Sequence, residues 1–205
     1  MIYLDNAATS FHKPDCVARA VVEAMQQAGN SGRGSSGEAM EASRIIFDTR
    51  CKIAQLFVVE GPECVAFTAN ATEALNTALF GILHPEREKV HAICTEMDHN
   101  SVLRPLYALE KRGMDLTILP ADGKGRISVD DLEAAIRPET KAIVCTHASN
   151  LTGNCNDIRS IGAIARKHGI LFIVDAAQTA GVFPISMKKD QIDILCFSGH
   201  KGLMG

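Results

Sequence analysis

The feature that most constrains the fold is a regular alternation of short apolar runs with segments of helical period, from about residue 65 onward. The apolar runs are continuous, which is typical of strands buried on both faces of a parallel sheet. The segments between them would supply crossover helices that cover the sheet. The pattern therefore predicts an open α/β sheet, with strands at 65–67, 90–95, 116–119, 142–146, 171–174 and 192–197.

Helices are predicted both before and between these strands. Two lie ahead of the first strand, at 14–28 and 38–56, and a Gly/Ser-rich loop at 29–37 joins them. Ser128 is expected to begin a crossover helix, because a side-chain hydroxyl can cap the first turn. Gly169 is expected to end another, because glycine tolerates the left-handed backbone of a helix end.

Composition excludes several classes of protein. Hydrophobic residues make up 46% of the chain and charged residues 22%, as in soluble globular proteins. The net charge of -3, with both signs mixed along the chain, argues against a nucleic-acid or polybasic membrane surface. No apolar run approaches the ~20 residues that span a bilayer, and the first residues do not resemble a signal peptide. We therefore expect a cytoplasmic protein in which residues 1–205 form one domain, with neither nucleic acid nor membrane as a partner.

The cysteines and histidines predict neither disulfides nor a metal. Seven cysteines are an odd number and form no C-x-x-C pair, so neither a disulfide framework nor a structural zinc site is expected. Cys64, Cys94, Cys145 and Cys196 fall in apolar runs and are predicted to be small buried hydrophobes rather than nucleophiles. No two of the seven histidines stand at i, i+4, so we predict no metal site.

Polar residues cluster just after the predicted strands, where ligands bind in an open α/β sheet. They occupy 68–72, 96–100, 146–150, 175–178 and 198–201. Because the carboxyl ends of parallel strands meet at one edge, we expect these five loops to converge on one site.

Each loop taken alone allows two interpretations. Segment 68–72 is either an ordinary helix cap or, with a helix beginning near Ala71, a phosphate site made of free backbone N–H groups. Asp175 needs a cationic partner, which is either a protonated cofactor ring nitrogen or an arginine. His99 is either a helix-capping imidazole or a ring stacked on a flat cofactor. Lys201 is either a solvated side chain or an amine nucleophile towards an aldehyde.

Together, the loops resemble those of a known family. The matching segments are 3–9, 67–76, 96–101, 147–153, 174–178 and 198–202. In their order and spacing the chain is similar to class V aminotransferase-fold enzymes of the cysteine desulfurase/selenocysteine lyase group, which use pyridoxal 5'-phosphate. The resemblance implies the large domain of fold-type I transferases, a three-layer α/β/α domain with a mostly parallel sheet. We expect this domain to be incomplete at its C-terminus and to lack the small domain.

The resemblance also implies roles for individual residues. Lys201 would form the internal Schiff base, and Lys201 or His99 would move protons during catalysis. Asp175 would pair with the pyridine nitrogen, and His99 would stack on the ring. The remaining implied cofactor-binding residues are Asn150 and Gln178 beside the ring, and Ala71, Thr72, Ser198 and His200 at the phosphate.

By the same resemblance, the parent enzymes remove sulfur or selenium from cysteine or selenocysteine and leave alanine. They would be homodimers that pass the sulfur to an acceptor protein. In the family, the nucleophilic cysteine and the arginine that binds the substrate carboxylate lie beyond the position of Lys201, so no residue here takes those roles. Two other hypotheses stay open: a class V aminotransferase acting on a small amino acid, and an inactive truncated chain.

Overall fold

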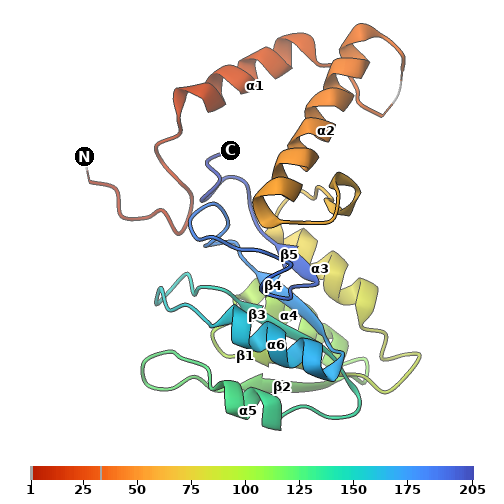
Figure 1. Ribbon diagram of the computed structural model, residues 1–205, viewed down its shortest axis with the longest axis vertical. Helices are drawn as coiled ribbons and strands as arrows, with labels where there is room; N and C mark the ends of the chain where they lie inside the picture. The colour runs from red at the N-terminus through yellow and green to blue at the C-terminus, as the bar shows by residue number, and fades with distance from the viewer. Residues whose placement is uncertain (1, 33) are drawn as a thin grey trace. The chain divides into compact units, whose positions relative to one another are not determined.

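The computed structural model describes residues 2–32 and 34–205 (Figure 1). The chain forms two compact units. The larger is Thr68–Ser198, and the smaller combines the residues up to Phe67 with Gly199–Gly205. The organisation of residues 1–205 as one domain stays a prediction. In the described part of the chain, none of the helices combines the length and apolar character needed to cross a membrane.

The larger unit is built on a five-stranded sheet in the order β2-β1-β3-β4-β5, in which every pair of neighbours is parallel. The parallel α/β sheet predicted from the apolar runs is therefore confirmed. Its strands are β1 (His91–Thr95), β2 (Asp115–Leu119), β3 (Thr140–Thr146), β4 (Leu171–Asp175) and β5 (Ile194–Cys196).

Helices cover both faces of this sheet (Figure 1). The chain steps outward from β1 to β2 and then returns past β1 to β3 and β4. Right-handed crossovers therefore place α4 on one face and α5 and α6 on the other, which gives the three expected layers. α3 packs against α4, and α5 packs against α6. These helices are α3 (Ala71–Ile82), α4 (Asn100–Glu110), α5 (Val129–Ala134) and α6 (Ile158–His168).

The core of the larger unit lies between the sheet and the pair α3 and α4. Leu75 and Leu79 of α3 and Leu106 of α4 are fully buried there against β-strand residues such as Val144. Complete burial of a leucine side chain contributes about 1.5–3 kcal/mol. This packing fixes the first turns of both helices beside the carboxyl edge of the sheet.

Both predicted helix boundaries are confirmed. The Ser128 hydroxyl accepts a hydrogen bond from the N–H of Asp131 at 3.1 Å and caps α5. Gly169 ends α6 with a φ of 66°, in the left-handed region.

The smaller unit contains α1 (Asp15–Gln27), α2 (Gly37–Phe57) and the short 3-10 helix η1 (Pro62–Cys64). The two long helices match the predicted segments 14–28 and 38–56. α2 begins where Ser36 accepts a hydrogen bond from the N–H of Ala39 at 3.3 Å.

The predicted strand at 65–67 is wrong. This segment follows η1, and no described strand pairs with it. A strand needs a hydrogen-bonded neighbour, and an apolar run without one remains irregular. Phe67 is 54% exposed, with the guanidinium of Arg50 5.8 Å from its ring centroid. Cys64 is exposed, so its predicted burial is also wrong, whereas Cys94, Cys145 and Cys196 are buried as expected.

The structure also corrects the expectation that every strand is buried on both faces. β2 is an edge strand, and Ile118 within it is 37% exposed. The helical period of this segment places Leu106 and Tyr107 on one apolar face of α4, but Leu106 is buried whereas Tyr107 is 41% exposed.

Candidate active site

The strand order creates one position in the larger unit suited to a ligand. β1 and β3 are neighbours, but the helices that follow them lie on opposite faces, so the loops after these strands diverge. Such a switch point at the carboxyl edge is where open α/β sheets bind ligands. Thr146 of β3 is aligned with Asp175 of β4, which is aligned with Cys196 of β5. The loops after these strands therefore leave from the same edge.

The first turn of α3 presents free backbone donors. Asn70 caps this helix, with its side-chain oxygen 2.9 Å from the N–H of Glu73, and the Glu73 carboxylate accepts the N–H of Ala69 at 2.6 Å. Among the described residues, none accepts the N–H groups of Ala71 or Thr72. Free N–H groups at the positive end of a helix bind phosphate or carboxylate. The cap and the anion site predicted here are compatible, because they use different N–H groups.

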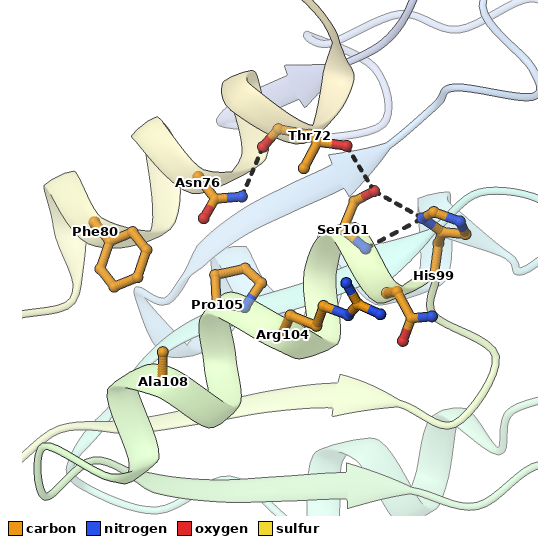
Figure 2. A pocket seen from close by; sticks show the side chains of 9 residues that line it. Thr72, Asn76, Phe80, His99, Ser101, Arg104, Pro105 and Ala108 are labelled. Carbon is orange, nitrogen blue, oxygen red and sulfur yellow. Dashed lines mark hydrogen bonds between the residues drawn. The ribbon is translucent and has the colours of Figure 1, made fainter.

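His99 caps α4, which confirms the capping alternative of the sequence analysis. Its Nδ1 accepts the backbone N–H of Ser101 at 3.1 Å and lies 2.7 Å from the Ser101 hydroxyl. The Ser101 hydroxyl is in turn 3.0 Å from the hydroxyl of Thr72, so side chains join the first turns of α3 and α4 (Figure 2). The His99 residue is exposed, which leaves its ring accessible to a ligand.

A groove of about 380 Å³ runs between α3 and α4 from this point (Figure 2). Thr72, His99 and Ser101 form its polar end, and Phe80 and Ala108 form its apolar end. Two of the predicted site residues thus share one groove.

Asp98 connects β1 to β3 at the switch point. One carboxylate oxygen accepts the N–H and the hydroxyl of Thr95, at 2.7 and 2.8 Å, and the other accepts the N–H of Thr146. Burial raises the pKa of Asp98 to about 7, the negative charge of Asp175 adds to the rise, and the hydrogen bonds from Thr95 and Thr146 oppose it. Two carboxyl groups therefore influence each other at this edge.

A side-chain hydrogen bond also joins the loops after β3 and β4. Nδ1 of the buried His147 lies 2.9 Å from the hydroxyl of Thr179, and burial lowers the His147 pKa. The turn after β3 is closed by a hydrogen bond from the N–H of Gly153 to the carbonyl of Ser149 at 3.0 Å. Asn150 lies exposed on this turn.

Asp175 ends β4 and is 4% exposed. Its carboxylate accepts the N–H of Ala177 at 2.9 Å, and the following turn carries the half-buried Gln178. Ser198 is buried at the end of the larger unit. The larger unit thus contains seven of the nine predicted site residues, in loops at the carboxyl edge or in the first turn of α3.

His200 and Lys201 belong to the smaller unit, where the beginning of the chain holds them. The carbonyl of His200 accepts hydrogen bonds from the hydroxyl of Ser10 at 2.9 Å and from the Lys13 ammonium at 3.1 Å. Nδ1 of His200 is 3.0 Å from the Thr9 hydroxyl. Lys201 lies in a turn within Gly199–Gly205. The placement of His200 and Lys201 beside the residues of the larger unit stays a prediction.

Sequence reasoning did not assign roles to Asp98, Ser101, His147 or Thr179. The available signal was position, because His147 directly follows β3 and Asp98 lies three residues after the end of β1. Their partners lie 48 and 32 residues away along the chain, so only the fold reveals the pairs. In residues 2–32 and 34–205, no three His, Cys, Asp or Glu side chains cluster in a way that could hold a metal ion.

Comparison with known proteins defines the class. The sequence profile of the family "Aminotransferase class-V" matches residues 2–205, so this chain belongs to that family. Among curated relatives, the cysteine desulfurase IscS of Shewanella baltica is 37% identical over 204 residues and that of Vibrio atlanticus is 35% identical. Each match covers 98% of this chain and 50% of the relative, so the chain spans about half the length of these relatives.

Solved structures give the same result. A structure described as "SspA in complex with cysteine" has a TM-score of 0.92 and 32% identity, over 98% of this chain and 58% of that chain. The apo cysteine desulfurase of Thermococcus onnurineus has a TM-score of 0.90 and 33% identity, over 100% of this chain and 51% of that chain. The fold is therefore that of the large domain of fold-type I enzymes.

Proposed function

We propose that this chain is the cofactor-binding part of a pyridoxal 5'-phosphate-dependent cysteine desulfurase or selenocysteine lyase. The observation that carries the proposal is that one unit contains both the free N–H groups of Ala71 and Thr72 and the buried carboxylate of Asp175. The free amides suit the phosphate, and a buried carboxylate suits a protonated pyridine nitrogen. The kinship with cysteine desulfurases supports the substrate class.

The residues present fit this cofactor, which supplies an electron sink for amino-acid substrates when it is bound. Ala71, Thr72, Ser198 and His200 would hold the phosphate. Asn150, Gln178 and the His99 ring would position the pyridine. Lys201 would provide the amine that holds the aldehyde carbon, and Lys201 or His99 would carry protons to and from the substrate.

The thiol chemistry of desulfuration is assigned to no cysteine of this chain. Burial raises the pKa of Cys196 to about 12 and raises the pKa values of Cys94 and Cys145 as well. A thiol must ionise to attack sulfur, so these three are unsuited to the task. On the family resemblance alone, the proposal places the nucleophilic cysteine and the arginine for the substrate carboxylate beyond the position of Lys201, outside this chain.

The partners are part of the same proposal. The substrate is an amino acid, cysteine or selenocysteine, and the similar SspA structure, which was solved in complex with cysteine, supports this choice. A homodimer, a protein acceptor for the sulfur and a cytoplasmic location complete the proposal, all three by family resemblance.

The test is cofactor capture by Lys201. The purified chain is mixed with pyridoxal 5'-phosphate, its visible spectrum is recorded, and the adduct is reduced with borohydride and located by peptide mass. We expect a yellow absorbance band and a label on Lys201. The Lys201→Ala variant should lose both, and Lys189→Ala, which removes an exposed lysine of the larger unit, should keep both.

Two results would refute the assignment: wild-type protein without the band, or Lys201→Ala with an unchanged band and label. If the cofactor is captured, incubating full-length protein with cysteine separates the two enzymatic hypotheses. Alanine together with an enzyme persulfide, which an added thiol reductant releases as sulfide, indicates desulfuration, whereas a keto acid indicates transamination.

A further inference from the structure

Ser101 connects two residues of the proposed site without itself belonging to the predicted set. It lies in the first turn of α4 and is 9% exposed. Its hydroxyl is 2.7 Å from Nδ1 of His99 and 3.0 Å from the hydroxyl of Thr72, and its backbone N–H donates to the same Nδ1 at 3.1 Å (Figure 2). Two groups of one residue therefore contact one ring nitrogen.

These contacts determine the positions of the protons. A backbone N–H can only donate, so Nδ1 of His99 must carry a lone pair, and the neutral ring must carry its proton on Nε2. The Ser101 hydroxyl can then only donate to Nδ1. The Ser101 hydroxyl has then used its only proton, so its oxygen can only accept, and the Thr72 hydroxyl must be the donor in the bond between the two. The hydrogen bonds run in one direction, from Thr72 through Ser101 to His99.

We propose that Ser101 is a positioning residue of this site, which holds His99 as the Nε2–H tautomer and links the ring to the phosphate-binding Thr72. The role in catalysis rests on the proposed function, whereas the tautomer and the link are properties of the chain alone. With Nδ1 engaged by Ser101, Nε2 is the ring atom that can exchange a proton with a ligand.

The link predicts communication between the phosphate and the ring. A Thr72 hydroxyl that donates to a phosphate oxygen no longer donates to Ser101. The Ser101 hydroxyl can then turn to donate to Thr72, and Nδ1 of His99 keeps only the backbone N–H. Phosphate binding at α3 therefore changes the hydrogen bonding of His99 on α4.

The first test is ¹⁵N NMR of histidine-labelled protein without cofactor, at a pH where the ring is neutral. We expect long-range ¹⁵N–¹H correlations to show His99 with an unprotonated Nδ1 and a protonated Nε2. Ser101→Ala removes the hydroxyl but keeps the backbone N–H, so the Nδ1 resonance should move towards that of a ring nitrogen that accepts one hydrogen bond instead of two. Ser160→Ala is the matched control, because Ser160 also donates its hydroxyl to the cap of its own helix, Asp157, at 2.6 Å. A protonated Nδ1 in the wild type, or an equal shift in both variants, overturns the proposal.

The second test adds inorganic phosphate to the same labelled protein. The backbone amide signals of Ala71 and Thr72 report binding, and the Nδ1 signal of His99 reports the link. We expect both to move in the wild type and only the amide signals to move in Ser101→Ala. Movement of the amide signals without Nδ1 in the wild type overturns the link. Amide signals that stay still refute the phosphate site of the proposed function, while the tautomer test still decides the role of Ser101.

Discussion

Replacement of Asp98 by asparagine should change the pH dependence of stability. Asp98 is 6% exposed, and its two oxygens accept three hydrogen bonds, two from Thr95 of β1 and one from Thr146 of β3. An amide keeps one accepting oxygen but turns an NH₂ group towards a backbone N–H. A buried donor without an acceptor costs about 1–3 kcal/mol, so Asp98→Asn should be destabilised by about that amount near pH 4.5, where the acid is largely neutral in the folded protein.

The difference in stability between Asp98→Asn and the wild type changes as the pH rises. The pKa of Asp98 is about 7 in the folded protein, above the ordinary value of 3.8. The folded state therefore binds this proton more tightly, and the corresponding stability is present below about pH 4 and is lost as the pH rises through 7. Linkage gives a loss of about 3 kcal/mol between pH 4.5 and pH 8 that the neutral asparagine does not suffer. Asp98→Asn should therefore match or exceed the wild type in stability at pH 8.

The assay is urea unfolding of both proteins across this pH range, with the larger unit followed by a probe on α4. Asp157→Asn is the control, because Ser160 hydrogen bonds lower the pKa of that exposed carboxyl. The stability that the Asp157 carboxylate contributes is present above the ordinary aspartate pKa and is lost only as the pH falls. This pH dependence is opposite to that expected for Asp98. Stability curves for wild type and Asp98→Asn that stay parallel from pH 4.5 to 8 would show that the reasoning about Asp98 is wrong.

Two further predictions concern the packing and titration of the larger unit. Gly162→Ala should cost about 2–3 kcal/mol in denaturant unfolding, because the added Cβ would collide with the backbone carbonyl of Asp190; unchanged stability would contradict this close packing. Burial, and secondly the charge of Arg137, lowers the His91 pKa, so the folded state binds a proton on this ring less readily than the unfolded state. The wild type should therefore lose stability as the pH falls below about 6.5, and His91→Gln should lose less. Its ring nitrogens lie 2.7 and 2.9 Å from the hydroxyls of Thr140 and Thr117, and an acid profile like that of the wild type would count against the assignment.

The strands of the sheet could be predicted from sequence because each consists of a short apolar run that must be buried. The same signal failed at 65–67, where an apolar run has no described strand beside it. It also overstated the burial of β2, since a sequence does not reveal which strand lies at the edge. Pairing depends on contacts that are distant along the chain, and a local pattern carries no information about them.

The candidate site could be predicted as a set of loops but not as a network. Asn70 and His99 were recognisable as polar residues before helices, and their capping bonds are local. The bond between Asp98 and Thr146 and that between Ser101 and Thr72 span 48 and 29 residues. Such pairs follow from strand order and helix packing, which the residue pattern does not specify.

The contact between Ser10 and His200 has a consequence for biosynthesis. The two residues are separated by 190 positions, so the ribosome releases one long before it makes the other. At about 5–20 residues per second, that interval lasts roughly 10–40 s. During this time the opening segment has no acceptor, and it can bind the lysine-bearing turn only after His200 has been synthesised.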